Sequence, residues 1–202
     1  MSDRVPQFSL DGVPCILVQL PASSHGGLRD DGGWELFLPA SSFGAELWKR
    51  LHCEGQVVAL GAAERRAYNV GLRRPTFPYD YVGSSGGRRE WEQYVALECA
   101  HDRSRIKKHR LSVPFPPMSA YATIMERPDI KHVFVVASRR GRPATGAFLY
   151  ANDLKIGFIT SSAFYAGGAG AVGVVLPEYA GGRVRFRNPR SRSFHDAFLI
   201  HI

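Results

Sequence analysis

The sequence predicts an α+β protein in which a small mixed α/β region precedes an antiparallel β-barrel. Two observations carry this prediction. In the first half of the chain, apolar residues recur at helical spacing in segments that lie between short apolar strands. Beyond residue 131, the chain consists of short apolar runs separated by glycine, proline or Asn-Asp turns. An antiparallel barrel is the natural closure for so many short strands.

The first half is expected to hold three strands and three helical segments. The expected strands are Val13–Leu20, Trp34–Leu38 and Gln56–Leu60, with a glycine-rich loop from Ala22 to Gly33. An amphipathic helix carries Phe43, Leu47 and Leu51, is capped by Ser41 or Ser42 and ends at Gly55. A helical turn is expected over Ala62–Val70, and a longer helix from Arg88 to about Lys108 after an irregular stretch.

The second half is expected to be nearly all β. The predicted strands are His132–Ala137, Ala144–Tyr150, Lys155–Thr160, Ala171–Leu176, Arg183–Arg187 and Phe194–His201. Pro114, Pro116 and Pro117 separate the halves. We therefore divide the chain into a tail (1–12), an α/β region (13–112), a proline-rich linker (113–131) and a barrel (132–202).

The composition favours a polyanion as partner. The chain has 202 residues, of which 45% are hydrophobic, which is enough for a proper core. Its formal net charge is +8 and its pI about 9.7, a balance that favours nucleic acid first and an anionic membrane surface second. Arginine greatly outnumbers lysine, and its planar fork suits phosphate. A GC-rich genome is the alternative cause of that bias, although it does not explain the net charge.

The cysteines and the apolar runs predict a reduced, intracellular protein. Cys15, Cys53 and Cys99 are far apart and odd in number, so they suggest neither a disulfide framework nor a zinc site. No apolar run reaches transmembrane length, and the N-terminus resembles neither a signal nor a transit peptide.

No residue pattern predicts a catalytic site. The seven histidines are scattered, and no paired-carboxylate or nucleophile motif occurs. Gly168, Gly170 and Gly173 fit the G-x-G-x-x-G pattern of dinucleotide sites. That site needs a helix directly after the glycines, whereas a strand stopped by Pro177 follows here. We interpret the glycines as a hairpin connection.

Basic residues form the candidate binding surface. Arg183, Arg185 and Arg187 alternate with Val184 and Phe186, so a strand would place three guanidinium groups on one face, about 6.6 Å apart. The apolar pair would face the core. A solvated strand face is the alternative interpretation. The absence of Asp or Glu nearby in the sequence favours phosphate contact instead.

Further basic residues extend this surface in the sequence-based prediction. They are Arg190, Arg192, Arg139, Arg140, Arg142, Lys107 and Lys108. Aromatic residues are not clearly interleaved with them, so backbone and shape recognition of RNA is expected rather than base stacking. Trp34, Trp48 and Trp91 lie on apolar faces, and we predict that they belong to the core.

The order of several motifs resembles a known family. VPCILVQLP, GWELFLP, the helix with the F-x-x-x-LW pattern, EGQVVALGAAE and FPYDY resemble the POPLD region of the largest protein subunit of eukaryotic RNase P and RNase MRP. KIGFITSSAFYAGGAGAVGVV and RVRFRNPRSRSFHDAFLIHI resemble that family's closing barrel, itself similar to the aminomethyltransferase barrel. Two departures are the absence of the family's long basic N-terminal portion and Ala59-Leu60-Gly61 in place of its Gly-Gly-Leu.

The resemblance implies a non-catalytic, RNA-binding scaffold that acts in tRNA and rRNA precursor processing. The implied partners are a structured RNA of the RNase P/MRP type and other protein subunits, without a cofactor, metal, membrane or small-molecule substrate. The implied compartment is the nucleus or nucleolus, with the mitochondrion as the alternative. Two other functions stay open: an RNA-binding subunit of another ribonucleoprotein, such as the mitochondrial ribosome or its assembly, and a remnant of a folate-dependent aminomethyltransferase.

Overall fold

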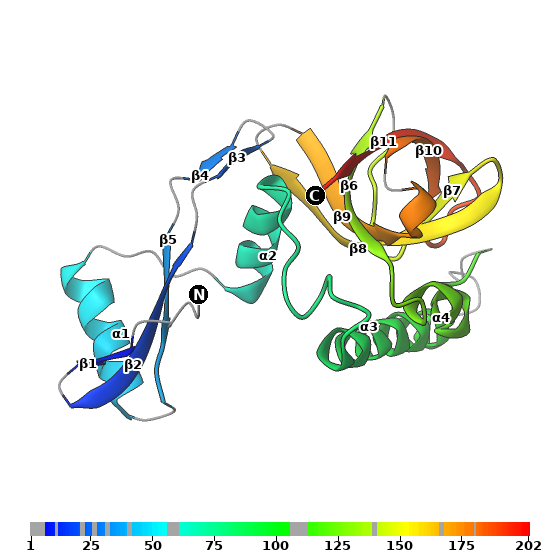
Figure 1. Ribbon diagram of the computed structural model, residues 1–202. Helices are drawn as coiled ribbons and strands as arrows, with labels where there is room; N and C mark the ends of the chain where they lie inside the picture. Colours follow the sequence, from blue (N-terminus) through cyan, green and yellow to red (C-terminus); the bar gives the residue numbers. More distant parts are fainter. Residues whose placement is uncertain are drawn as a thin grey trace.

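The computed structural model describes residues 7–10, 12–20, 23–25, 28–30, 33–39, 42–55, 61–105, 113–138, 141–165, 168–179 and 181–202. A small sheet with one helix occupies one side of the molecule and a closed barrel the other, with a second helix between them (Figure 1). This arrangement confirms the predicted α+β class and the barrel. Among the described residues, no helix has the length and apolar character needed to cross a membrane.

The N-terminal sheet is antiparallel and has the strand order β1-β2-β5. Its strands are β1 (Gln7–Leu10), β2 (Val13–Leu20) and β5 (Gly33–Phe37), followed by helix α1 (Ser42–Glu54). The bounds of β2 and the end of α1 agree with the sequence-based prediction. Strand β1 lies in the segment expected to be a tail, and the hairpin of β3 (Ser23–His25) and β4 (Leu28–Asp30) in the expected loop. The strand expected over Gln56–Leu60 lies outside the described residues.

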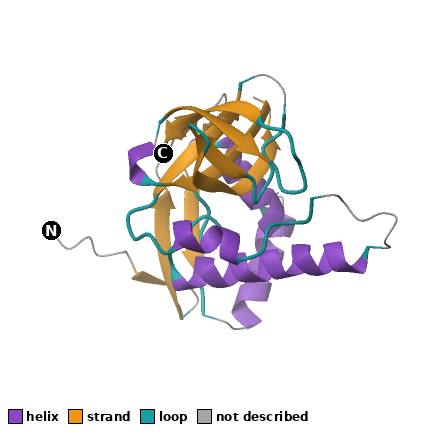
Figure 2. Ribbon diagram, turned by 90° about the vertical axis from the view of Figure 1, so that its right-hand side faces the viewer, coloured by secondary structure: helices purple, strands orange, loops and turns teal. Residues whose placement is uncertain are grey.

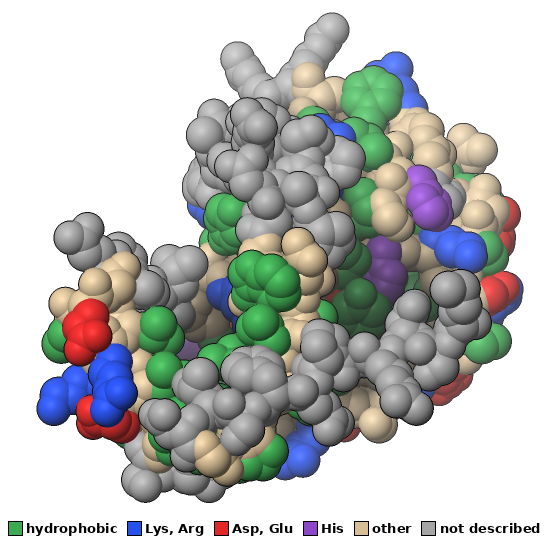
Figure 3. Space-filling view, turned by 60° about the vertical axis from the view of Figure 1, so that its left-hand side comes forward, with side chains coloured by type: hydrophobic (Ala, Val, Ile, Leu, Met, Phe, Trp, Pro, Cys, Tyr) green, Lys and Arg blue, Asp and Glu red, His purple; other side chains and the backbone are tan. Residues whose placement is uncertain are grey.

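Large apolar side chains are exposed in this N-terminal part. The prediction that Trp34 and Trp48 belong to the core is wrong, because their exposed fractions are 60% and 51%. Three strands and one helix offer too little material to cover both faces of a sheet. Figure 3 shows hydrophobic side chains at the surface of this region. Because both rings are exposed, truncating either one to alanine should change stability little. Trp91, by contrast, is buried as predicted.

Three further helices connect the sheet to the barrel. They are α2 (Ala62–Gly71), α3 (Ser85–Ser104) and α4 (Ser119–Met125). Helix α3 begins earlier than predicted because the Ser84 hydroxyl accepts a hydrogen bond from the Gly87 amide at 3.0 Å and caps the helix. Helix α4 lies within the segment expected to be a proline-rich linker, where its Tyr121 and Ile124 are buried.

The barrel is closed and has the strand order β10-β11-β6-β9-β8-β7, with every pair antiparallel. Its strands are β6 (Lys131–Ala137), β7 (Phe148–Ala151), β8 (Leu154–Tyr165), β9 (Gly168–Val175), β10 (Gly182–Arg187) and β11 (His195–His201). Alternate side chains of all six strands fill the interior.

The three glycines of the G-x-G-x-x-G pattern lie within β9. They form part of a paired strand and not the hairpin connection that the sequence suggested. A Cβ atom on Gly173 would lie 2.7 Å from the backbone oxygen of Phe158 on β8. Glycine therefore permits close strand approach here, and the strand geometry excludes the dinucleotide site.

Helices α3 and α4 cover the outside of the barrel. Figure 2 shows them together beneath the strands. The Trp91 ring of α3 lies 4.9 Å from the Phe158 ring of β8 and 5.3 Å from the Tyr121 ring of α4, measured between centroids. Such a buried aromatic cluster contributes several kcal/mol to folding. Helices α3 and α4 therefore share one core with the barrel.

Candidate nucleic-acid interface

Strand β10 presents its arginines on the outer face of the barrel. Val184 and Phe186 are buried in the interior, as predicted, so Arg183, Arg185 and Arg187 share the opposite face. Arg183 is the most exposed of the three, with 71% of its side chain accessible. The strand alternation seen in the sequence is thus confirmed at this position.

Acidic residues lie beside two of these arginines, and the interpretation that the cluster lacks acidic neighbours is wrong. Arg183 pairs with Asp196 of β11 at 3.4 Å, and Arg185 pairs with Asp153 of the turn between β7 and β8. Both acids are distant in sequence, and the antiparallel pairing brings them to β10. Exposed ion pairs contribute little to stability, so a phosphate can replace the carboxylate at small cost.

Aromatic rings lie between the guanidinium groups, so the interpretation that aromatic residues are not interleaved with the basic ones is wrong. The Arg185 guanidinium lies 4.9 Å from the centroid of the Phe194 ring. The Arg187 guanidinium lies 5.5 Å from Phe194 and 5.6 Å from Tyr150. The two rings contact each other edge to face at 5.1 Å. We call these four residues, with Arg183, the arginine–aromatic face.

Lys155 adds a further positive charge beside this face. Its Nζ donates to the backbone oxygen of Ala120 at 2.8 Å and lies 4.5 Å from the Phe148 ring centroid. Partial burial lowers the pKa of Lys155, and the charge of Arg187 lowers it further. The effect of Arg187 indicates that positive charges are gathered here, which is a property of anion-binding surfaces.

Apart from Arg190, the remaining predicted site residues fall into two groups. Arg142 and Arg192 are exposed. The loop that carries Arg142 is tied to the end of β10, because the Asn188 side-chain amide donates to the Arg142 backbone oxygen at 2.7 Å and accepts from the Ala144 amide at 3.0 Å. Arg139, Arg140, Lys107 and Lys108 lie outside the described residues.

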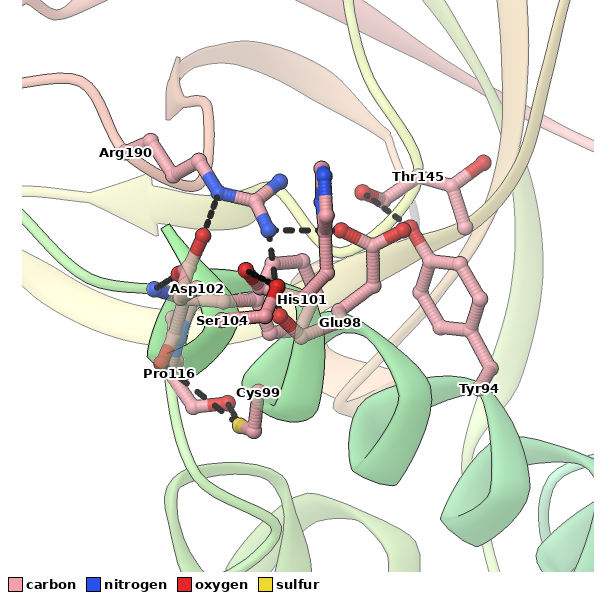
Figure 4. Close-up of polar contacts among 10 residues, drawn as sticks. Tyr94, Glu98, Cys99, His101, Asp102, Ser104, Pro116, Thr145 and Arg190 are labelled. Carbon is pink, nitrogen blue, oxygen red and sulfur yellow. Dashed lines mark hydrogen bonds and ion pairs between the residues drawn. The ribbon is translucent and has the colours of Figure 1, made fainter. Parts of the chain in front are cut away.

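Arg190 is partly buried and paired with acidic residues, and this environment does not support the prediction that it contacts RNA. Its side chain is 21% exposed and donates to Asp102 at 2.8 Å and to Glu98 at 2.7 Å, both on α3. Figure 4 shows the guanidinium group between these carboxylates. The guanidinium also lies 5.1 Å from the Phe115 ring centroid. Arg190 therefore connects helix α3 to the barrel through these ion pairs.

The geometry at Arg190 predicts a pH-dependent loss of stability. Partial burial opposes the ionisation of Asp102, but hydrogen bonds from the Phe115 amide and Arg190 outweigh it, so the pKa of Asp102 is lowered. Stability from such a group is present above its unfolded-state pKa and is lost as the pH falls through the folded one. Arg190→Met should lower the melting temperature by about 4–8 °C near neutral pH, for a loss of about 2 kcal/mol.

Thermal melts of Arg190→Met between pH 3 and 7 measure this effect. The difference from the wild type should shrink as the pH falls through the lowered pKa of Asp102, because its carboxyl group then loses the charge that pairs with Arg190. Arg192→Met, on the same turn but exposed, serves as the control and should leave the melting temperature within about 2 °C. An unchanged melt of the Arg190 variant at pH 7 would contradict the structural role.

The FPYDY motif forms a second polar centre, below the surface. Asp80 is fully buried and accepts hydrogen bonds from the Thr76 amide at 2.6 Å and from the hydroxyls of Thr160 and Ser161 on β8. Arg66 of α2 donates to the Ser161 hydroxyl at 2.7 Å. This network joins the loop after α2 to the barrel.

The comparisons with known proteins agree with the first half of the resemblance. Among curated proteins, none matches the chain. Residues 33–114 match the profile of the POPLD (NUC188) domain, a domain of RNase P and RNase MRP protein subunits. The matched segment covers β5, α1, α2 and α3 together with the FPYDY motif, whereas the arginine–aromatic face lies on the barrel beyond it. The chain thus carries a POPLD match in its first half, joined through one shared core to an antiparallel barrel.

Proposed function

We propose that this chain is a non-catalytic, RNA-binding scaffold subunit of a ribonucleoprotein of the RNase P/MRP type, acting in tRNA and rRNA precursor processing. It corresponds to the C-terminal region of the largest protein subunit of those enzymes, works with other protein subunits and acts in the nucleus or nucleolus. Three observations support the proposal: the POPLD match, the net charge of +8 and the arginine–aromatic face of the barrel.

The arginine–aromatic face is the observation that carries RNA binding. Guanidinium groups donate paired hydrogen bonds to phosphate, and aromatic rings beside them restrict the directions in which those groups point. The three arginines follow one strand at spacings that suit successive phosphates of a folded RNA. Contacts of this kind position an RNA without reading its sequence, which is what a scaffold requires.

The identity of the RNA bound in the cell tests this proposal. The chain would be tagged in its native cells and cross-linked, and the RNA recovered with it sequenced. Recovery of an RNase P-type or MRP-type RNA, at levels well above those obtained with an unrelated tagged basic protein, is the expected result. Enrichment of mitochondrial ribosomal RNA would favour the alternative ribonucleoprotein, and recovery of no RNA above the control would contradict the proposal.

A further inference from the structure

The loop between α2 and α3 holds exposed aromatic rings at the surface. Phe77 is 66% exposed and Tyr81 40% exposed, although both flank the fully buried Asp80. The rings of Phe77 and Tyr81 have their centroids 5.9 Å apart, and the ring of His132 on β6 lies 4.9 Å from that of Tyr81. These three residues form a continuous row of rings, which we call the aromatic row.

Buried hydrogen bonds hold the loop that carries the aromatic row. Asp80 holds the loop through its three acceptor contacts, and the His132 Nε2 atom forms a hydrogen bond with the Asp80 backbone oxygen at 3.0 Å. The Arg66 guanidinium lies over the Tyr79 ring at 4.6 Å. Because the loop is fixed at these points, the exposed rings are held in place before any partner arrives, which lowers the entropic cost of binding.

Positive charge lies beside the Phe77 end of the row. Arg88 and Arg89 are exposed in the first turn of α3, which contains no acidic residue. That turn packs beside Phe77, since a Cβ atom on Gly86 would lie 3.4 Å from the Phe77 Cζ atom. Rings bordered by cations suit a ligand that has flat apolar faces and a negative backbone.

We propose that the aromatic row stacks against the bases of unpaired RNA nucleotides, whose phosphates lie near Arg88 and Arg89. The inference rests on the proposed function and deepens it, because it assigns single-stranded RNA to the loop between α2 and α3 and the adjoining part of β6, and the folded RNA backbone to the β10 face of the barrel. Stacking of this kind tolerates any base, since every base has a π face.

Binding of the full-length chain to two RNA probes tests the inference. One probe is an unstructured adenine-rich 12-mer and the other a stable RNA hairpin with a short tetraloop. Phe77→Ala should weaken binding to the 12-mer about tenfold and leave binding to the hairpin stem unchanged. Phe77→Trp, which keeps an aromatic ring, should bind the 12-mer as tightly as the wild type does. Phe77→Leu, which is apolar but not aromatic, should bind it more weakly than the wild type does. Leu97→Ala removes a similarly exposed apolar side chain from α3 and should change neither affinity.

Each outcome decides the question. The inference would be overturned if Phe77→Ala or Phe77→Leu bound the 12-mer as tightly as the wild type does. It would also be overturned if the wild-type protein bound the hairpin but not the 12-mer. Loss of a co-purifying protein from cells carrying Phe77→Ala, with RNA binding intact, would identify a protein-docking surface and also overturn it. Failure of the wild type to bind either RNA would contradict the proposed function itself. Melting curves equal to that of the wild type exclude misfolding as the cause.

Discussion

Replacing Asp80 by alanine is expected to destabilise the protein by about 3–5 kcal/mol, the largest effect of any polar substitution that we predict. Asp80 has no exposed surface and connects two halves of the chain that are distant in sequence. Its carboxylate accepts from the Thr76 amide and from the hydroxyls of Thr160 and Ser161. Alanine would leave the Thr76 amide and the Ser161 hydroxyl without this acceptor, whereas the Thr160 hydroxyl can still donate to the Val172 backbone oxygen at 3.1 Å. Each buried donor left without an acceptor costs about 1–3 kcal/mol.

Thermal unfolding of two aspartate variants measures this effect. For a chain of this size, the predicted loss corresponds to a fall in melting temperature of about 6–20 °C. Asp153→Asn is the matched control, because the Asp153 side chain is 86% exposed and asparagine tolerates the positive φ of 64° at this turn position. It should change stability by less than about 0.5 kcal/mol. Asp80→Asn keeps one acceptor oxygen and should fall between Asp80→Ala and this control. Equal melting temperatures for Asp80→Ala and Asp153→Asn would contradict the account of the network.

The elements that could be predicted from sequence are those fixed by local pattern. Strand β2, helices α1 and α2 and the strands of the barrel have clear periodicity and clear turn residues, and the structure confirms them. Helix α4 was missed because seven residues between prolines give too short a pattern. Periodicity also identifies an apolar face without showing what covers it, which is why Trp34 and Trp48 were assigned to the core.

The errors in the candidate site come from contacts that are distant along the chain. The acceptors of Arg190 lie 88 and 92 residues before it, so nothing in the local sequence distinguishes it from Arg192. Tyr150 lies beside β10 because β7 closes the barrel against that strand, and a list of strands does not reveal this order. Phe194 could have been noticed, since it follows the arginine-rich turn directly.

The dependence of RNA affinity on salt tests the arginine–aromatic face directly. Each phosphate neutralised by an arginine releases condensed counterion, so the slope of log affinity against log salt reports the number of contacts. Replacing Arg183, Arg185 and Arg187 together by glutamine should flatten this slope by roughly two to three units. The melting temperature should change little, because Arg183 is exposed and Arg185 and Arg187 are partly exposed on the outer face of the barrel. The ion pairs of Arg183 and Arg185 are weak for the same reason.

A matched variant separates a local contact from a general loss of charge. Arg50 and Arg127 are also exposed and paired with acids, but they lie on α1 and beyond α4, away from the barrel face. The double variant Arg50→Gln, Arg127→Gln should keep the wild-type slope to within about one unit. The measurement is equilibrium binding of one structured RNA at several salt concentrations. A flattened slope for the triple variant alone is the predicted result, and a triple variant with the wild-type slope and affinity would contradict RNA binding by this face.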